Sequence, residues 1–591
     1  MMLIRRRSLE SPKTKTLLLV GADRRGSKAI YRHPKNQLRL ASFFAIAAIA
    51  LLIATAAVAD STTHDPNAPC ASCHRAIYER YRQTPMANGS GPAAAGFTPA
   101  DFTHQTSGIH YRVYEDGSRV FMSYDRNASS ANHEAGPAAS RDLHGKQQLL
   151  YFLGSGKRGR TYLFEQQGYW FELPINWYTK KGIWDMTPNY LSAKEMPFTL
   201  PVDFSCLRCH ASEAQRSLPD ARNHYAAQPF LAGGVTCASC HGDGAAHIAA
   251  KGHAPILNPS QLDPIRRDSV CLNCHLEGKV IVVKQGKSLE SFKPGDDLFD
   301  YALFFVRAQE SGSGGRATSQ WEALQQSACK RGSGDKLTCT TCHDPHGSPS
   351  ASERVQFYRT RCLGCHSQPV YATQHHPEQT DCSSCHMPRS STTDIAHEQV
   401  TDHRIQIPTP LHPPAPRSDT LVALNEKNVS DRDLGLAYAQ LATHGDEHAA
   451  REAYRLLQSA EQQGNTGDDH ELHTELGFLS QLMGQTDSAQ REYQTALKAD
   501  AFDSVAEGDL ALIEARRQNY AAAIQLWQTA FQHDPTQLAA GDNLAQVECS
   551  QGQRDAALAT LDHVLLFSPD EQRAHALQSA IRSGAMRCTG Q

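Results

Sequence analysis

The chain has 591 residues and a formal net charge of −4, with 58 Lys and Arg against 62 Asp and Glu. One hydrophobic core cannot serve a chain of this length, so roughly two to four domains are expected. The near balance of charge leaves no basic excess of the kind that binds nucleic acid, and we predict no nucleic-acid partner. The informative counts are 17 Cys and 29 His, which indicate either cofactor ligation or a disulfide-rich secreted protein.

Residues 1–59 have the parts of a signal peptide. The first 39 residues carry eleven Lys and Arg, and the run from Leu40 to Ala59 is apolar except for one Ser and one Thr. The run ends in Ala-Val-Ala, a cleavage pattern of small residues. A run of about 20 apolar residues can also span a bilayer, so a membrane anchor is the alternative. Both interpretations place the rest of the chain outside the cytoplasm, in a periplasmic or other extracytoplasmic compartment.

Seven segments of the form Cys-x-x-Cys-His lie within residues 60–406 and use 14 of the 17 Cys. The paired Cys are Cys70 and Cys73, Cys206 and Cys209, Cys237 and Cys240, Cys271 and Cys274, Cys339 and Cys342, Cys362 and Cys365, and Cys382 and Cys385. The His that follow are His74, His210, His241, His275, His343, His366 and His386.

The spacing of this motif has a chemical reason. Two thiols three residues apart on a helical turn can both reach the vinyl groups at one edge of a porphyrin, and the adjoining His then lies under the iron. Zinc ribbons do not require a His after every second Cys, thioredoxin-like motifs occur once per domain, and disulfide frameworks lack this regularity. We therefore predict a multiheme cytochrome c domain over residues 60–406, with seven covalently attached hemes c and the seven His as proximal iron ligands. Heme attachment outside the membrane agrees with export.

The region between the first two motifs reads as β structure. Residues 100–200 contain two stretches in which aromatic or β-branched residues alternate with polar ones, and each stretch holds a turn candidate, Asp116-Gly117 and Gln167-Gly168. These are hairpin signals, so a small antiparallel β subdomain is expected here. The rest of the Cys-rich region lacks long periodic segments, which is typical of short helices and loops wrapped around cofactors.

A Pro-rich linker and a repeat domain complete the chain. Residues 407–419 contain five Pro and should be extended. Residues 420–591 repeat small residues, an aromatic or Leu, and a helix-ending position at a period of 34, as in Ala489, Ala523 and Ala557. This period is that of the tetratricopeptide repeat, and such units stack into a solenoid. The expected fold is mainly α, with an irregular multiheme core, a small antiparallel β subdomain and a C-terminal α-solenoid.

The second axial ligand of each iron decides what a heme can do. A distal His gives a low-potential electron-transfer heme, Met raises the potential, and an empty position admits substrate. His247 follows His241 by six residues and His346 follows His343 by three, too near to cap their own hemes, so each would serve a neighbouring heme. Candidates are numerous, because the expected exported region before the repeats contains fourteen other His: His64, His104, His110, His133, His144, His224, His247, His253, His346, His375, His376, His397, His403 and His412.

Several tracts together resemble multiheme cytochromes fused to tetratricopeptide repeats. They are TPMA at Thr84–Ala87, LGSGKRGRTYL at Leu153–Leu163, WYTKKGIWDMTPNY at Trp177–Tyr190, LTCTTCHDPH at Leu337–His346, and DCSSCHMPR with VTDHRI between Asp381 and Ile405. The heme part is similar to the tetraheme cytochrome domain that accepts electrons from hydroxylamine oxidation, extended by extra motifs. The resemblance implies a mostly helical core of closely packed, mainly bis-His hemes. By the same match the distal ligands would include His104, His247, His346, His376, His397 and His403, to which His224 is added as a candidate.

Two functions remain open from the sequence. The first is an electron carrier between redox partner proteins, with the repeats docking a partner. The second is a multiheme reductase or oxidase of a small nitrogen or sulfur compound, which needs one open iron; no catalytic residue is assigned. All seven motifs end in His, which favours the electron carrier over the enzyme. The three remaining Cys are Cys329, whose state is undetermined, and Cys549 and Cys588, which could pair between the last repeat and its capping helix.

Overall fold

A computed structural model describes residues 65–127, 141–188, 190–308, 320–366, 381–389, 401–407, 419–464 and 466–590. The predicted signal peptide or anchor and almost all of the Pro-rich linker lie outside these ranges, as do His376 and His397. Within the described ranges, no helix combines the length and apolar character needed to cross a bilayer.

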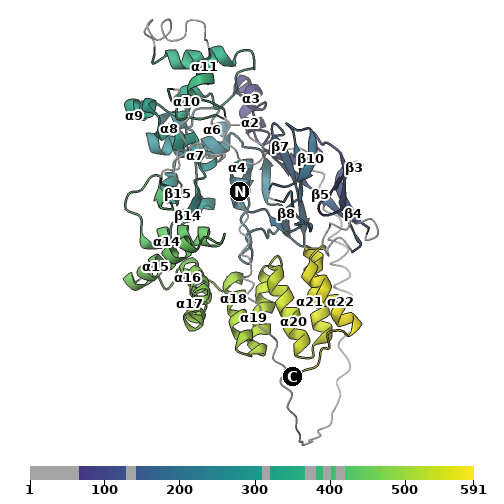
Figure 1. Ribbon diagram of the computed structural model, residues 1–591. Coiled ribbons are helices and arrows are strands. Elements are labelled where there is room, and N and C mark those ends of the chain that lie inside the picture. The colour runs from purple at the N-terminus through teal and green to yellow at the C-terminus, as the bar shows by residue number, and fades with distance from the viewer. Residues whose placement is uncertain are drawn as a thin grey trace, which may run out of the picture.

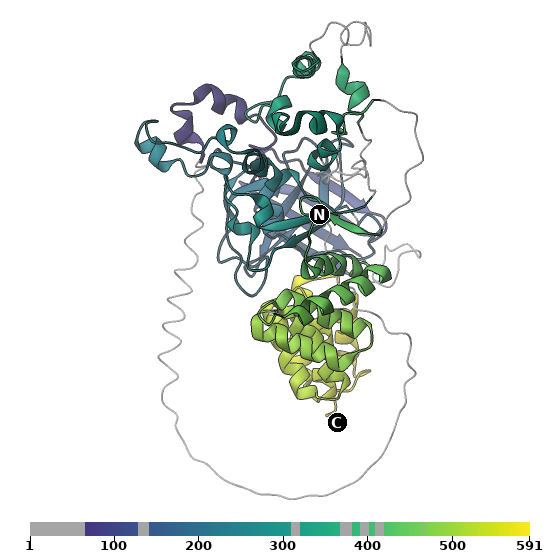
Figure 2. The same ribbon diagram turned by 90° about the vertical axis from the view of Figure 1, so that its left-hand side faces the viewer.

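The molecule has a Cys-rich part with two β-sheets beside it, and a row of C-terminal helices below both (Figure 1). In Figure 1 the first of these helices lies under strands β14 and β15, and the last lie under the sheets that contain β4 and β8. Figure 2, turned by 90°, shows the same C-terminal helices stacked as one compact array beneath the rest of the chain.

The expected antiparallel β structure is confirmed, and it consists of two sheets. One has the order β2-β3-β4-β5, and the other runs β1-β6-β7-β8-β11 with β9 and β10 joined to β7. The strands are β1 (Ser90–Pro92), β2 (Ala100–His104), β3 (Ile109–Asp116), β4 (Arg119–Arg126), β5 (Leu143–Leu149), β6 (Tyr151–Leu153), β7 (Gly159–Gln166), β8 (Tyr169–Glu172), β9 (Ile175–Tyr178), β10 (Ile183–Met186) and β11 (Leu200–Pro201).

Local sequence accounts for the hairpins of these sheets. The turn between β7 and β8 is the predicted Gln167-Gly168 pair, and both residues have positive φ, 54° and 85°. Two positive-φ residues between paired strands match the right-handed twist of a hairpin. Alternate residues of β3 point inward, and its Tyr111 and Val113 are fully buried. Together with Phe164 they belong to the core shared by the two sheets.

Short helices dominate the Cys-rich part, as expected. They are α2 (Ala68–Ala71), α3 (Arg75–Tyr81), α4 (Phe204–His210), α5 (Ala238–His241), α6 (Ala245–Ala249), α7 (Pro264–His275), α8 (Gln320–Gln325), α9 (Ala328–Ser333), α10 (Cys339–Cys342), α11 (Arg354–Leu363) and α13 (Cys382–His386), with single 3₁₀ turns η3 (Pro259–Gln261), η4 (Leu289–Ser291), η5 (Leu298–Asp300) and η6 (Gly334–Lys336). A short hairpin, β12 (Ala211–Ala214) with β13 (Phe230–Gly233), lies between them.

A three-stranded sheet that the sequence analysis did not predict joins the Cys-rich part to the repeats. It consists of β14 (Val280–Val283), β15 (Ala302–Arg307) and β16 (Leu421–Ala423), and β16 comes from beyond the Pro-rich linker. Phe305 of β15 packs in one hydrophobic cluster with Leu436 and Leu457 of the first repeat helices. The two parts therefore share a core at this place.

The C-terminal helices form the predicted repeat pairs. They are α14 (Asp431–Ala442), α15 (Glu447–Gln463), α16 (His470–Leu482), α17 (Thr486–Ala499), α18 (Ser504–Arg516), α19 (Tyr520–His533), α20 (Leu538–Ser550), α21 (Arg554–Phe567) and α22 (Gln572–Ser583). The small residues at the repeat period are needed where helices cross, because a Cβ on Gly477 would lie 2.6 Å from the ring of Tyr493.

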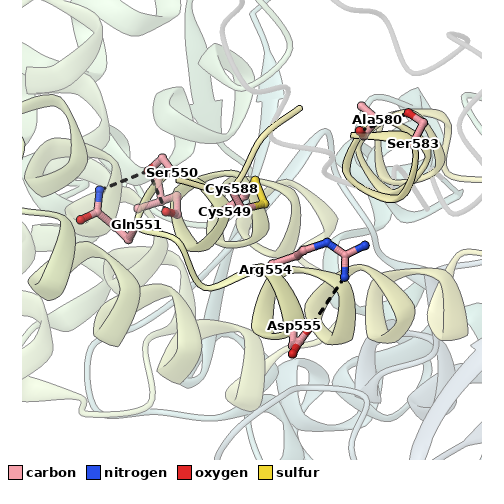
Figure 3. Close-up of a disulfide and its surroundings, with 9 residues drawn as sticks. Cys549, Ser550, Gln551, Arg554, Asp555, Ala580, Ser583 and Cys588 are labelled. Carbon is pink, nitrogen blue, oxygen red and sulfur yellow. Dashed lines mark hydrogen bonds and ion pairs between the residues drawn. A yellow bond between two sulfur atoms is a disulfide. The ribbon is translucent and has the colours of Figure 1, made fainter. Parts of the chain in front are cut away.

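A disulfide fastens the last repeat. Cys549 near the end of α20 is bonded to Cys588, 39 residues later and beyond α22 (Figure 3). The pairing is the one considered from the sequence. Such a link closes the last helices onto the repeat before them, which is expected to stabilise this end of the solenoid by limiting the unfolded chain.

Candidate cofactor site

All seven Cys-x-x-Cys-His motifs line one cavity. Its volume is ≈ 3530 Å³, and every one of the seven His and thirteen of the fourteen motif Cys are on its wall. The space amounts to about 500 Å³ for each motif, within the 300–1,000 Å³ range of ordinary cofactor pockets. Motifs that are scattered over residues 70–386 of the chain therefore surround a common space rather than seven separate ones.

Helix caps hold the motif helices in place. The side chains of Asp203, Asp263 and Asp381 each accept a backbone N–H at the start of α4, α7 and α13. A carboxylate at this position satisfies an N–H group that has no partner within the helix. Each of these three helices ends with the His of its motif, so both thiols and the imidazole project from one or two helical turns, as the predicted attachment chemistry requires.

Motifs that are distant in sequence touch one another. The Cys274 thiol lies 3.2 Å from the carbonyl of Arg208, so the second and fourth motifs are adjacent. The backbone N–H of Cys237 donates to the side chain of Asn67 at 2.8 Å, which brings the third motif to the helix that carries Cys70. All fourteen motif Cys are free thiols, so these contacts leave them available for thioether bonds.

Three pairs of imidazoles face each other across the cavity. His74 and His247 have ring centroids 6.4 Å apart with an interplanar angle of 14°. The separation is 6.0 Å for His241 and His346 and 6.2 Å for His343 and His403. Direct ring stacking would bring them closer, whereas one iron held by a nitrogen of each ring spaces the two centroids by about 6 Å. The pairs thus have the spacing of two axial ligands.

Several of these rings are fixed through their Nδ1 atoms. Nδ1 lies 2.9 Å from the Leu257 carbonyl in His241, 2.7 Å from that of Ala254 in His247, and 2.9 Å from that of Thr401 in His403. A carbonyl can only accept, so Nδ1 carries the proton and the Nε2 lone pair is left for a metal. His386 has the same arrangement, with Nδ1 2.8 Å from the carbonyl of Gln406.

Burial favours the neutral form of four histidines of the cavity wall. It lowers the pKa of His343 to about 4, and the pKa values of His210, His275 and His403 are also lowered, in each case mainly because burial disfavours the charged ring. Only the neutral imidazole has a lone pair to give to a metal. The wall of the cavity therefore presents these rings in the state that iron requires.

The wall of the cavity also holds an arginine whose hydrogen bonds are incomplete, since Arg267 pairs with Asp268 at 3.4 Å through Nε alone. The Nη2 atom of this side chain is buried with no hydrogen-bond partner. Burying an unpaired donor of a charged group is costly, so such an atom indicates a missing acceptor. A heme propionate would supply it. The thiol pairs, the lone pairs of the rings and this guanidinium together fit the predicted heme.

Two of the predicted distal ligands lie away from the cavity wall. His104, at the end of β2, has both ring nitrogens occupied, with Nδ1 2.8 Å from the Ser107 hydroxyl and Nε2 3.0 Å from the Leu191 carbonyl. His224 stacks on Tyr169 at 4.1 Å, and its Nδ1 lies 2.6 Å from Asp220. The structure brings neither of them to a motif. Of the other candidates, His247, His346 and His403 face motif histidines, and His376 and His397 lie outside the described residues.

Sequence reasoning missed one histidine of the cavity wall. His444, just after the first repeat helix, lines the same space as the motifs. His444 comes after the Pro-rich linker, in a region whose sequence predicts a separate repeat domain. The only sequence signal is the position of His444 at the end of a repeat helix, and such a position is not specific for ligation.

Comparison with known proteins supports both parts of this description. Residues 332–370 match the family described as the doubled CXXCH motif, and residues 515–581 match the tetratricopeptide repeat. No curated protein matches the chain. Similar solved structures include MamA from AMB-1, with 18% identity over 27% of this chain and 82% of that one and a TM-score of 0.24. YrrB, a TPR protein with an unusual peptide-binding site, has 20% identity over 24% and 74%, with a TM-score of 0.22.

Each matched family supports a property of one part of the chain. A doubled CXXCH motif is a feature of multiheme c-type cytochromes and supports covalently bound heme c in this chain. The tetratricopeptide match supports a repeat region of the kind used in protein–protein interaction.

Proposed function

We propose that this protein is an exported heptaheme c-type cytochrome that passes electrons between redox partner proteins. The observation that carries the proposal is the single cavity lined by all seven motifs. A protein that used its hemes separately would have no need to gather them around one space. Hemes that share one space have their edges close together, which is what transfer from one iron to the next requires.

Axial ligation supports electron transfer over substrate chemistry. Three motif histidines already face a second imidazole, and two imidazoles leave an iron no free position. The facing residues also come from other parts of the chain. His247 follows the third motif and faces the first, while His346 follows the fifth and faces the third. Each such ligand would tie two neighbouring hemes together.

The remaining parts fit the same role. The segment 1–59 would deliver the unfolded chain to the compartment in which heme is attached, and it would also hold the protein at a membrane if it stays uncleaved. The solenoid would dock a redox partner beside the hemes. Because the first repeat helix shares a core with β15, a partner bound there would have a fixed position relative to the cavity.

Mass spectrometry of the mature protein tests the number of cofactors. We expect the intact mass to exceed that of the processed chain by seven tetrapyrroles, and tryptic peptides with all seven motifs to carry one each. Reduction should convert all seven to the ferrous state. A correctly exported preparation with no added tetrapyrrole would contradict the proposal, and a number below seven would identify the motif that is not used.

Substitution of the facing histidines tests the ligand assignment. We expect His247→Ala, His346→Ala and His403→Ala each to convert one low-spin heme to high-spin, because one iron loses its second imidazole. Electron paramagnetic resonance and the optical spectrum measure this. His104→Ala and His224→Ala are matched controls that should leave the spin state of every heme as it is in the wild type. A spin change in the controls, or none in the three variants, would show that the distal ligands lie elsewhere.

A further inference from the structure

Three metal-ligating side chains lie close together in the repeat region, outside the cavity. They are Glu461 near the end of α15, His473 in α16 and Glu492 in α17, so they come from three consecutive helices (Figure 1). One donor atom of each, a carboxylate oxygen or a ring nitrogen, lies within 4.8 Å of the other two. None of the three residues lines the cavity that the motifs surround, so the heme sites give this cluster no role.

The ring of His473 is oriented by a carbonyl outside the cluster. Its Nε2 atom lies 3.0 Å from the carbonyl of Thr466. A carbonyl can only accept, so Nε2 carries the proton and the Nδ1 lone pair is turned toward the carboxylates. Thr466 belongs to the connection 464–469 between α15 and α16, which is longer than the connection 500–503 between α17 and α18. The longer connection therefore supplies the contact that presents Nδ1.

The Nδ1 atom of His473 faces negative charge. It lies 2.7 Å from Oε2 of Glu492, and both side chains are buried, with exposed fractions of 4% and 11%. Burial disfavours the charged ring, but the hydrogen bond to Glu492 and the charge of this residue outweigh burial and raise the pKa of His473. Two acceptor atoms at this distance repel each other unless a cation lies between them, so Nδ1 needs either a proton or a metal ion.

A proton on His473 leaves the third group of the cluster uncompensated. The Glu461 carboxylate has no hydrogen bond or ion pair with any residue that the structure describes. Its pKa is raised by partial burial and by the charge of Glu492, and the opposing effects of His473 and Arg491 are weaker. A protonated ring balances only one of the two carboxylates. A divalent cation would balance both and would use all three donor atoms.

We propose that Glu461, His473 and Glu492 bind a divalent transition-metal ion such as Zn²⁺. Zinc binds imidazole nitrogen and carboxylate oxygen, and a water molecule would complete a four-coordinate site. Bonds of about 2.0–2.2 Å allow two ligands of one ion to lie up to about 4 Å apart, so donor atoms within 4.8 Å reach this geometry by small side-chain rotations. Glu461 is partly exposed, which leaves a path for the ion and a position for the water.

The ion would join the first repeat to the second. Glu461 lies in the last helix of the first repeat, and the other two ligands lie in the two helices of the second. Leu472, next to His473, packs in the hydrophobic cluster that contains Phe305 of β15. A metal ion at this place would fasten α17 to helices that already share a core with the Cys-rich part. The inference does not depend on the proposed function, because the site needs no heme.

Isothermal titration of the mature holoprotein with Zn²⁺, after treatment with EDTA, tests the site. We expect the wild type to bind one more equivalent of Zn²⁺ tightly than Glu461→Gln does, and to release a proton from His473 as this equivalent binds. Loss of an outer partner of a metal ligand costs about 10–100-fold in affinity, so loss of a ligand itself should cost at least about tenfold. Glu447→Gln is the matched control, because it makes the same change on the same helix at a side chain that is 89% exposed. This variant should bind Zn²⁺ as the wild type does.

Glu461→Gln keeps the contact between His473 and Glu492, so it should fold as the wild type does. His473→Gln should remove the same equivalent of Zn²⁺, and X-ray absorption at the zinc edge should show one imidazole among oxygen ligands. Equal Zn²⁺ binding by the wild type and Glu461→Gln would overturn the inference, and His473 would then be only a protonated partner of Glu492. A zinc spectrum with several imidazoles would also overturn it, because the ion would then lie on other histidines.

Discussion

A heme-free form of the chain will lose the structure of the Cys-rich part and keep that of the solenoid. Residues 60–591, produced in the cytoplasm where no heme is attached, should show fast amide hydrogen exchange in the helices that carry the motifs. The reason is the size of the cavity, ≈ 3530 Å³, which protein side chains do not fill. Hydrogen-exchange mass spectrometry of the heme-free and mature proteins measures the difference.

The free-energy cost of an empty cavity of this size makes the loss of structure in the heme-free form hard to avoid. Empty space in a protein interior costs about 24 cal/mol per Å³, and whole domains are stable by only about 5–15 kcal/mol. Water would fill the open parts of the cavity. Even if only a tenth of it stayed dry, the cost would be about 8 kcal/mol, which is comparable with the entire stability of a domain. The apolar faces of bound porphyrins remove this cost and add the gain of their own burial.

Helices α17 to α19 provide the internal control for this experiment. They contain fully buried Tyr493 and Trp527, and their packing partners come from neighbouring repeats. Their exchange should be equally slow with and without heme. If the motif helices are equally protected in both forms, the cavity does not depend on heme and the argument from its size is wrong.

Local patterns predicted local structure well in this chain. The Gln167-Gly168 pair forms the turn it predicts because two positive-φ residues suit only a hairpin of this kind. The repeat period predicts the solenoid because each helix touches its sequence neighbours, as Gly477 and Tyr493 do. Both features depend on contacts between residues that are near in sequence. A local sequence pattern can therefore predict them.

Pairings between distant segments could not be predicted in the same way. The covalent motif is local, whereas His74 and His247 face each other across 173 positions of sequence. Nothing near His104 in the sequence reveals that both its ring nitrogens are already used within the β structure. The sheet formed by β14, β15 and β16 crosses the linker, and His444 reaches the cavity only because of that sheet. Fourteen candidate histidines therefore allowed many possible pairings with the seven motif histidines. Only the tertiary structure reduces their number.

The other end of the solenoid is held by a buried ion pair, and its removal should be strongly destabilising. Asp570, between α21 and α22, accepts two hydrogen bonds from Arg126 of β4 at 2.6 and 3.0 Å, and both side chains are 1% exposed. Its Oδ2 atom also accepts the backbone N–H of Met196 at 3.1 Å. This one carboxylate therefore joins the last repeat to the β-sheets.

Asp570→Ala should lower the free energy of unfolding by about 3–5 kcal/mol, because it leaves the Arg126 guanidinium buried without a counter-charge. Urea denaturation of the holoprotein, followed by far-UV circular dichroism, measures this.

Asp555→Ala is the control: that carboxylate is 98% exposed and pairs with Arg554 at 3.6 Å, so the loss should stay below about 1 kcal/mol. The double variant Arg126→Met with Asp570→Leu should recover most of the stability, because the fully buried guanidinium is removed together with its counter-charge. Arg141, which also lies 3.4 Å from Asp570, is 25% exposed and keeps contact with water. Equal losses in Asp570→Ala and Asp555→Ala would mean that the solenoid is held to the sheets by its apolar contacts, such as Phe567 against Tyr169, and that the ion pair contributes little.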